Sequence, residues 1–416
     1  MRETLVILLI LCLAACKNNE SPTGNQNQHT GGSGTPPGTP GTLKAVAVSQ
    51  SEIDLNWTAA SLSVMGYRVE RYDTSGRFIF VDSTQASTLR CSDYGLLCST
   101  TYFYRVFAFN NAGFSAQSNL ARATTLTDAF AIHSAGTINQ LNGIFFTSPS
   151  IGFAVGNNGT LLRSTNGGGN WDTLSSATTN QLNCISFSDQ ETGVAVGKAG
   201  TILRTTDGGT GWAKPESRTK NDLNSVCYAG SGTWIIVGYA GTILRSTDAG
   251  ATWTNQASGI TSILSAVGFA DQNAGSAVGM SGVILYTSDG GVSWLKQTNI
   301  TTNSLLGVYF NGTNNGTAVG ASGTVLRTTN AGSTWFIQPS GVAGSLYGVS
   351  YVGSNFGIAV GFKGALIQTT DGGKTWSNQP SGVQNTFRGV SFNDSHTATT
   401  VGAAGIVVSI VVCNGP

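Results

Sequence analysis

The stretch Gly364-Ala-Leu-Ile-Gln-Thr-Thr-Asp-Gly-Gly-Lys-Thr-Trp376 decides the fold, because versions of it recur along the chain at a fixed interval of 41 residues. Its closing tryptophan recurs at Trp171, Trp212, Trp253, Trp294, Trp335 and Trp376. The glycine of a Val-Gly pair recurs with the same interval at Gly156, Gly197, Gly238, Gly279, Gly320, Gly361 and Gly402. An apolar residue opens each unit, at Leu141, Leu182, Leu223, Leu264, Leu305, Leu346 and Phe387. The C-terminal part of the chain therefore consists of seven repeat units.

The seventh unit lacks its tryptophan, because one further interval after Trp376 ends just beyond the sequence. One interval before Trp171 stands Phe130, and residues 130–141 align without gaps on residues 253–264. We therefore expect a strand that precedes the first unit to complete the seventh.

A period of about 40 to 45 residues that carries four short β segments is typical of one blade of a β-propeller. In the third unit we expect strands over residues 223–228, 233–237, 242–246 and 252–257, separated by turns that contain glycine. Radial closure protects the sheet edges that an open array would expose. The sequence predicts an all-β fold, in which residues 127–416 form a seven-bladed β-propeller closed by an N-terminal strand.

The N-terminus carries Arg2 and an apolar run over residues 5–15. This run is shorter than the roughly 20 residues that a membrane-spanning helix needs, and residues 1–16 are typical of a secretory signal. Residues 13–16, Leu-Ala-Ala-Cys, resemble the lipobox of bacterial lipoproteins, and this resemblance implies that Cys16 is lipidated. The alternative is a plain signal peptide. We expect an exported protein that is lipid-anchored to the bacterial membrane, at the outer membrane or the cell surface.

Two further segments precede the repeats. Residues 17–41 are rich in Asn, Gly, Thr, Pro and Gln, and they are expected to form a flexible linker. Residues 42–126 alternate apolar and polar residues in short runs, as in an antiparallel β-sandwich. They resemble a fibronectin type III module, most clearly at Leu55-Asn-Trp57 and over residues 66–71 and 101–110. In an exported protein Cys91 and Cys98 are candidates for a structural disulfide, and two free thiols are the alternative.

Composition argues against several classes of function. The net charge of +1 and a charged fraction of only 10% argue against electrostatic binding of nucleic acid. The chain has three histidines and no Cys-x-x-Cys pair, so the sequence does not support a metal or redox site. We expect no cofactor.

A turn with the sequence Asp-Gly-Gly or Asp-Ala-Gly joins the third and fourth expected strands of a unit. It is identified as the Asp box, Ser/Thr-x-Asp-x-Gly-x-Thr-Trp, which sialidases, other glycoside hydrolases and non-catalytic propellers share. Its acceptor position is occupied by Asn166, Asp207, Asp248, Asp289, Asn330 and Asp371. An amide accepts the same hydrogen bond as a carboxylate but cannot ionise. We therefore interpret the box as a structural lock of the turn.

The full unit, seen best in residues 193–212, resembles the family of photosystem II stability and assembly factors, over residues 130–416. The resemblance implies a seven-bladed propeller that binds a membrane protein under assembly and has no known catalysis. Arginines are thought to form a binding patch in that family, and the repeat arginines here are Arg163, Arg204, Arg245 and Arg327.

The sequence favours a binding protein over an enzyme. A glycoside hydrolase would need two carboxylates that flank a cleft. Asp189, Asp271 and Asp394 are repeat turn residues, and the regular interval leaves no long loop for a cleft. We therefore predict no catalytic residue and expect a non-catalytic protein-binding or assembly scaffold. The alternative is a carbohydrate-binding or sialidase-like glycoside hydrolase propeller.

We predict the binding surface at the turns between the second and third strands, which read Val-Gly-x-x-Gly. Large apolar residues at exposed tips reduce solubility without helping the fold, so we interpret this ring as the partner site. Lys214, Arg218 and Lys220, on the connection after the second unit, are expected beside it. The alternative is that these turn residues vary without selection. The expected partner is a protein of the cell envelope or a glycan. The first variable residues of the turns are Asn157, Lys198, Tyr239, Met280, Ala321, Phe362 and Ala403.

Overall fold

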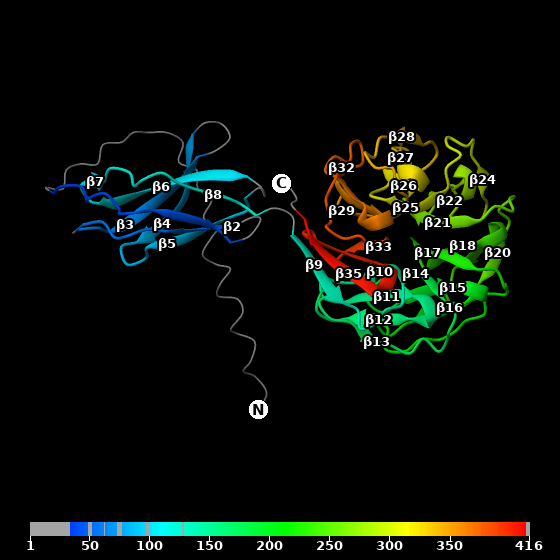
Figure 1. The fold of residues 1–416 in the computed structure, drawn as a ribbon. Coiled ribbons are helices and arrows are strands. Elements are labelled where there is room, and N and C mark those ends of the chain that lie inside the picture. Colours follow the sequence, from blue (N-terminus) through cyan, green and yellow to red (C-terminus); the bar gives the residue numbers. More distant parts are fainter. Residues whose placement is uncertain are drawn as a thin grey trace, which may run out of the picture. The chain divides into compact units, whose positions relative to one another are not determined.

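The computed structural model describes residues 34–48, 52–61, 63–72, 77–96, 100–126 and 129–412. The predicted signal sequence, with Cys16, lies outside these residues. The described chain is all-β and divides into two compact units near Thr124 (Figure 1). Within these ranges no helix has the length and apolar character that crossing a membrane requires.

The N-terminal unit contains two antiparallel sheets whose apolar faces form its core. Trp57 is buried there against Tyr67, edge to face, with ring centroids 5.5 Å apart. One sheet contains β1 (Lys44–Ala47), β2 (Glu52–Asn56) and β5 (Arg90–Tyr94). The other contains β3 (Gly66–Tyr72), β4 (Phe78–Gln85), β6 (Thr101–Asn110), β7 (Gly113–Phe114) and β8 (Ala121–Thr124).

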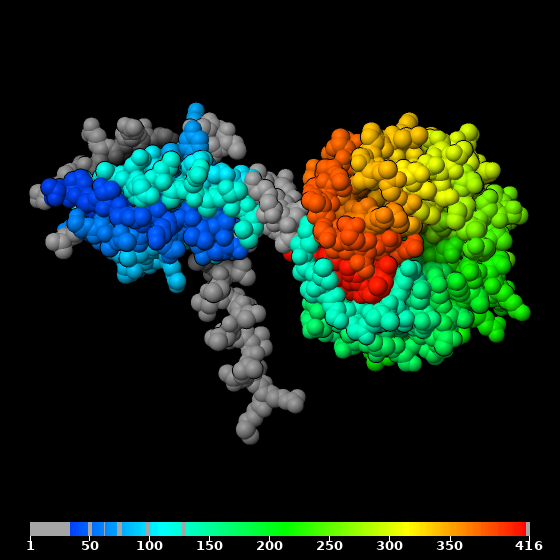
Figure 2. Space-filling model, in the orientation of Figure 1, coloured from blue at the N-terminus to red at the C-terminus, as the bar shows by residue number. Residues whose placement is uncertain are grey.

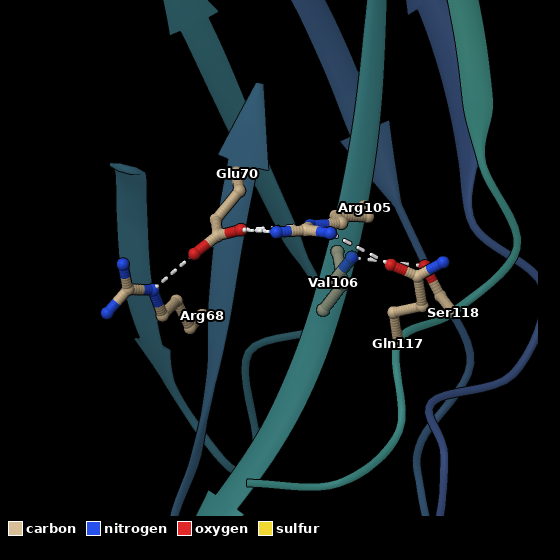
Figure 3. A network of polar contacts seen from close by, with 6 residues as sticks. All are labelled: Arg68, Glu70, Arg105, Val106, Gln117 and Ser118. Atoms are coloured by element: carbon tan, nitrogen blue, oxygen red, sulfur yellow. Dashed lines mark hydrogen bonds and ion pairs between the residues drawn. The ribbon is translucent and has the colours of Figure 1, made fainter. Parts of the chain in front are cut away.

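A polar network crosses the larger sheet of this unit. The buried carboxylate of Glu70 accepts hydrogen bonds from Arg68 Nε at 2.8 Å and from Arg105 Nη2 at 2.7 Å (Figure 3). Arg105 Nη1 also donates to Gln117 Oε1 at 3.0 Å, which ties β6 to the segment before β8. Two arginines compensate the cost of burying this charge.

The candidate disulfide of this unit stays a prediction. Cys91 in β5 has a free thiol in the structure, and Cys98 lies outside the described residues. Burial and, to a smaller extent, the nearby carboxylates of Asp82 and Asp93 together raise the pKa of the Cys91 thiol to about 12.

The C-terminal unit contains seven antiparallel sheets, numbered here in chain order. The first contains β10 (Leu141–Phe146), β11 (Gly152–Gly156), β12 (Leu161–Ser164) and β13 (Asp172–Thr173). The second contains β14 (Leu182–Phe187), β15 (Gly193–Gly197) and β16 (Ile202–Thr205). The third contains β17 (Leu223–Gly230), β18 (Thr233–Gly238), β19 (Ile243–Ser246) and β20 (Thr254–Gln256). The fourth contains β21 (Leu264–Phe269), β22 (Gly275–Gly279), β23 (Ile284–Thr287) and β24 (Leu295–Lys296).

The remaining three sheets continue the pattern, and all seven are arranged around a common centre (Figure 1). The fifth contains β25 (Leu305–Phe310), β26 (Gly316–Gly320), β27 (Val325–Thr328) and β28 (Phe336–Gln338). The sixth contains β29 (Leu346–Val352), β30 (Phe356–Gly361), β31 (Leu366–Thr369) and β32 (Ser377–Asn378). The seventh contains β33 (Phe387–Phe392), β34 (Thr397–Gly402), β35 (Ile406–Val411) and β9 (Ala129–Ser134).

Strand β9 is the fourth strand of the seventh sheet, although it precedes all the other strands of the unit. It pairs antiparallel with β35, from Ser134 opposite Ile406 to Ala129 opposite Val411. The seventh sheet also packs on the first, because β33 contacts β10. Figure 2 shows the red surface of the seventh sheet between the orange sixth sheet and the cyan β9 and first sheet.

The first strands of the sheets face the centre and approach one another closely. A Cβ atom on Gly389 of β33 would lie 3.4 Å from the Cα atom of Gly143 in β10. A cavity of about 450 Å³ is lined by residues from the first strands of all seven sheets. The Asp-box tryptophans close the other side of the core: Trp171 is buried and donates from its indole Nε1 to Gly168 O at 3.0 Å.

We predict that the pairing of β9 with β35 is needed for a soluble monomer. Removal of residues 129–140 from the full chain exposes the backbone edge of β35, so the variant should aggregate. Light scattering after size-exclusion chromatography measures this. A monomer with the melting temperature of the parent would contradict the prediction.

A second variant tests the pairing without deleting residues. Ala131 and Ser409 are direct partners, so A131C/S409C should form a disulfide on oxidation. Peptide mass spectrometry detects it, and its absence would argue against the register.

Candidate functional site

Seven three-residue turns, one in each sheet, join the second strand to the third. We call the end of the unit that carries them the turn face. In every turn the middle residue is left-handed, with φ between 51° and 57°, and the glycine that follows has φ between 66° and 73°. The glycine is required, because a Cβ atom on Gly241 would collide with the carbonyl oxygen of Ile260. The turns are η1 (Asn157–Gly159), η2 (Lys198–Gly200), η3 (Tyr239–Gly241), η4 (Met280–Gly282), η5 (Ala321–Gly323), η6 (Phe362–Gly364) and η7 (Ala403–Gly405).

The first residue of each turn is the one that the sequence predicts as a binding residue. Tyr239 is 48% exposed, Met280 39% and Phe362 46%, and Lys198 is also exposed. Asn157, Ala321 and Ala403 are partly exposed. The backbone of these turns is thus fixed by the repeat, whereas the side chain at the tip is free of the core.

The predicted basic residues lie on the connection from the second to the third sheet, beside η2. Lys214, Arg218 and Lys220 are exposed and line a hollow of about 520 Å³ together with Gly200. Every ion pair among the described residues lies in the N-terminal unit. Lys214, Arg218 and Lys220 therefore form no ion pair with a described carboxylate. Lys214 also borders a larger hollow of about 840 Å³, which is lined mainly by Thr, Ser, Asn and Gly residues of the first two sheets.

Arg218 occupies a backbone conformation that favours glycine. Its φ is 56°, and the equivalent position of four other units is a glycine with φ between 68° and 73°, at Gly136, Gly259, Gly341 and Gly382. A side chain in the left-handed region costs about 1 to 2 kcal/mol. The fold alone would therefore favour glycine at this position.

Charge is separated between the two ends of the unit. The turns and connections of the turn face carry five cations, Lys198, Lys214, Arg218, Lys220 and Lys363, and two carboxylates, Glu216 and Asp222. The opposite end holds the Asp boxes and the turns between first and second strands, and it is rich in carboxylates. These are Asp189, Glu191, Asp207, Asp248, Asp271, Asp289, Asp371 and Asp394, and the same end also holds the cations Lys374, Arg204, Arg245 and Arg327.

The Asp-box side chains act as hydrogen-bond acceptors that hold their turns. Asp248 Oδ1 accepts from the backbone N–H of Thr252 at 2.9 Å and from Ser246 Oγ at 2.7 Å. Asn166 Oδ1 accepts the equivalent bonds at 2.9 and 3.0 Å. Partial burial alone would raise the pKa of Asp248, but hydrogen bonds from Thr252 and Ser246 outweigh it and lower the pKa to about 2. A carboxylate that is ionised at neutral pH is no proton donor.

The repeat arginines tie neighbouring sheets together. Arg204 Nε donates to the Asp-box carbonyl of Ala249, in the next sheet, at 2.7 Å. Arg245 donates likewise to Gly290 at 2.9 Å and Arg327 to Gly372 at 2.8 Å. At the junction of the seventh and first sheets, Asn393 Nδ2 donates to the equivalent carbonyl of Gly167 at 2.8 Å. Arg163 differs, because its Nε is buried without a hydrogen-bond partner.

Neither a metal site nor a reactive thiol emerges from the described residues. They contain no group of three His, Cys, Asp or Glu side chains that could hold a metal ion. Cys184 and Cys227 line the central cavity, and burial raises the pKa of both thiols, to about 12 for Cys227. Thiols that stay protonated are poor nucleophiles and poor metal ligands.

Comparison with known proteins identifies both units. Residues 169–259 and 253–340 match the family described as photosynthesis system II assembly factor YCF48. Residues 38–124 match the fibronectin type III domain. These matches confirm the two resemblances of the sequence: the chain combines an Asp-box (BNR) repeat propeller with a fibronectin type III module.

Solved structures show the same fold for the C-terminal unit. The structure described as YCF48 bound to D1 peptide is 20% identical, covers 68% of this chain and 97% of its own, and has a TM-score of 0.57. YCF48 from Cyanidioschyzon merolae is 21% identical, with coverage of 68% and 99% and a TM-score of 0.57. The WD40 β-propeller domain of Doa1 is 10% identical, with coverage of 68% and 97% and a TM-score of 0.54.

We predict that Arg204→Ala lowers the free energy of unfolding by about 1 to 2 kcal/mol, because it removes a charge-assisted hydrogen bond between two sheets. Arg163→Ala is the matched control, since Arg163 has the same repeat position without that bond, and it should cost less. Urea unfolding followed by tryptophan fluorescence measures both. Equal losses would show that the bond to Ala249 does not hold the sheets together.

Proposed function

We propose that this chain is a non-catalytic scaffold that binds a protein partner on the turn face of a closed, seven-bladed propeller. The observation that carries the proposal is the exposure of Tyr239, Met280 and Phe362 at turn tips whose backbone the repeat already fixes. The similarity to an assembly factor solved with a peptide supports a protein as the ligand.

Several observations support the closed seven-bladed architecture. The seven sheets follow the seven sequence units, β9 pairs with β35, and β33 of the last sheet contacts β10 of the first. The cavity at the centre is lined by residues of the first strand of every sheet. In such a ring the seven turn tips surround one axis, so a single partner can contact several of them.

The apolar tips are better explained by a partner than by the fold. Ala321 and Ala403 occupy the same position in other sheets, so the turn does not need a large side chain. Burial of a Tyr, Met or Phe side chain contributes about 1.5 to 3 kcal/mol, which is available to a complex only if a partner covers it. Aromatic residues and methionine are also the types enriched in protein interfaces.

The basic residues extend this surface over the second and third sheets. Lys198, Lys214, Arg218 and Lys220 form no ion pair with a carboxylate among the described residues. The last three line one hollow, together with Glu216. Unpaired cations on one side of a surface attract an acidic partner and accelerate its association. The unfavourable backbone of Arg218 is consistent with a residue kept for binding.

The carbohydrate-active alternative has less support. The Asp-box carboxylates accept hydrogen bonds within their own turns, at the end of the unit opposite to the exposed aromatic tips. Their position on a turn-locking motif favours a structural role over a pair of catalytic acids.

We also propose that the scaffold is exported and anchored to a membrane by its N-terminal segment. Residues 1–16 would be the lipoprotein signal, with lipidation at Cys16, and residues 17–41 a flexible tether. Residues 42–126 would be a spacer module and residues 127–416 the propeller. This order would anchor the propeller to the bacterial membrane, at the outer membrane or the cell surface.

We predict that Tyr239→Ser and Phe362→Ser weaken partner binding without lowering the melting temperature, because both side chains lie outside the core. Phe336→Ser is the matched control, since Phe336 is 57% exposed but lies in the outer strand β28. A photo-crosslinking residue at 239 or 362 should yield one discrete product in native envelopes, and the same residue at 336 should not. Equal labelling from all three positions would count against the turn face.

We also predict that Arg218→Gly separates binding from stability. Glycine relieves the left-handed conformation, so the free energy of unfolding should stay constant or rise by up to about 1 kcal/mol. The crosslink yield from position 239 should fall, most clearly at low ionic strength. Reduced stability together with an unchanged yield would contradict a binding role for Arg218.

A further inference from the structure

A group of polar and aromatic side chains lies at the centre of the turn face, where the first strands begin. The second residue of each first strand surrounds the axis there, next to the glycine that precedes each turn. In three sheets this residue is an asparagine that clamps the next sheet. Asn142 Nδ2 donates to Leu182 O at 2.9 Å, Asn183 to Leu223 O at 2.8 Å and Asn224 to Leu264 O at 2.8 Å.

The seventh sheet has Arg388 at this position and lacks the clamp. The Arg388 guanidinium stacks on the ring of Tyr347, the equivalent residue of the sixth sheet, with its central carbon 4.2 Å from the ring centroid. Its side chain makes neither a hydrogen bond nor an ion pair with any residue in the described ranges, and its Nε is shielded from solvent. The fourth, fifth and sixth sheets have Ser265, Leu306 and Tyr347 at this position, whereas the seventh sheet places a cation without an ion-pair partner at the axis.

The turn that packs against β33, the strand of Arg388, carries an aromatic and a basic residue. Turn η6 lies against β33, and the backbone N–H of Lys363 donates to Thr386 Oγ1 at 3.3 Å. The Lys363 ammonium lies 5.4 Å from the centroid of the exposed Phe362 ring. Neither β29, β33, η6 nor residues 379–386 contains an Asp or Glu. A group that neutralises Arg388 must therefore come from outside these elements.

We propose that Arg388 and Tyr347, with the Phe362–Lys363 tip, form a carboxylate-binding site for a polypeptide segment that carries an apolar residue beside the carboxylate. The terminal amino groups of a guanidinium match the two oxygens of a carboxylate, and stacking on Tyr347 holds the guanidinium plane in place. Phe362 offers a surface for the neighbouring apolar side chain. The proposal rests on the proposed function, since it names the chemistry that a partner presents to the turn face.

The source of the carboxylate can be a chain terminus or an Asp or Glu side chain, and small probes distinguish them. N-acetyl-phenylalanine represents a terminal carboxylate and N-acetyl-phenylalanine amide is its neutral control. N-acetyl-aspartyl-phenylalanine amide represents a side-chain carboxylate next to an aromatic residue. Because the Nε of Arg388 is shielded, its N–H signal exchanges slowly and reports binding in an NMR titration of the full chain.

We expect at least one of the two acids to shift this signal saturably, and the amide to leave it in place. Arg388→Gln should weaken binding of that acid about tenfold, since it keeps a polar side chain but removes the charge-assisted pair, followed on backbone signals of η6. Lys374→Gln, at the opposite end of the unit, is the control for charge alone and should bind normally. Equal shifts with acid and amide, or no saturable shift with either acid, would overturn the proposal.

The NMR titration and the crosslinking experiment test different claims, so either proposal can fail without the other. Probe binding at Arg388 without specific crosslinks from positions 239 and 362 would keep this site and refute the scaffold. Specific crosslinks without probe binding would keep the scaffold and refute this site.

Discussion

The backbone pairing between β9 and β35 joins the first strand of the C-terminal unit to its last, and the other sheets depend on it. Each sheet packs its apolar residues against the next, so a missing outer strand would leave one edge unpaired and one interface incomplete. The hydrogen bonds of Arg204, Arg245 and Arg327 also hold neighbouring sheets together, because each joins one sheet to an Asp-box carbonyl of the next. Together these contacts hold the backbone of the turns in place.

A fixed backbone explains how one end of the unit can carry function. The glycine of each turn is required for close approach to a neighbouring carbonyl, whereas Tyr239, Met280 and Phe362 at the tips keep 39 to 48% of their surface exposed. Tyr239, Met280 and Phe362 can therefore differ from Ala321 and Ala403 without changing the fold. The carboxylates, by contrast, lie at the other end, where they accept hydrogen bonds within turns. The same repeat thus separates an acidic structural end from a basic and aromatic end.

The features of the fold that repeat with the 41-residue interval could be predicted from the sequence. The 41-residue interval indicated the seven sheets, and the strands expected in the third unit differ from β17 to β20 by at most two residues at each end. The segment aligned with the missing seventh tryptophan begins at Phe130 and contains all of β9 except Ala129. The contacts of residues that depart from the repeat could not be predicted from the sequence. Asn393 shares no repeat position with Arg204, and only the structure shows that it bonds the equivalent carbonyl at the junction of the seventh and first sheets. Arg388 has the repeat position of Asn142, but only the structure shows that it stacks on Tyr347. The repeat arginines were expected in a binding patch, but three of them hold neighbouring sheets, because their carbonyl acceptors belong to another unit.

The position of β9 also has a mechanical consequence. Every force transmitted through the segment before Ala129 reaches the C-terminal unit at this strand, whose six residue pairs with β35 bear the load before any other sheet does. The pairing of β9 with β35 is therefore the first contact of the C-terminal unit that such a tension would test.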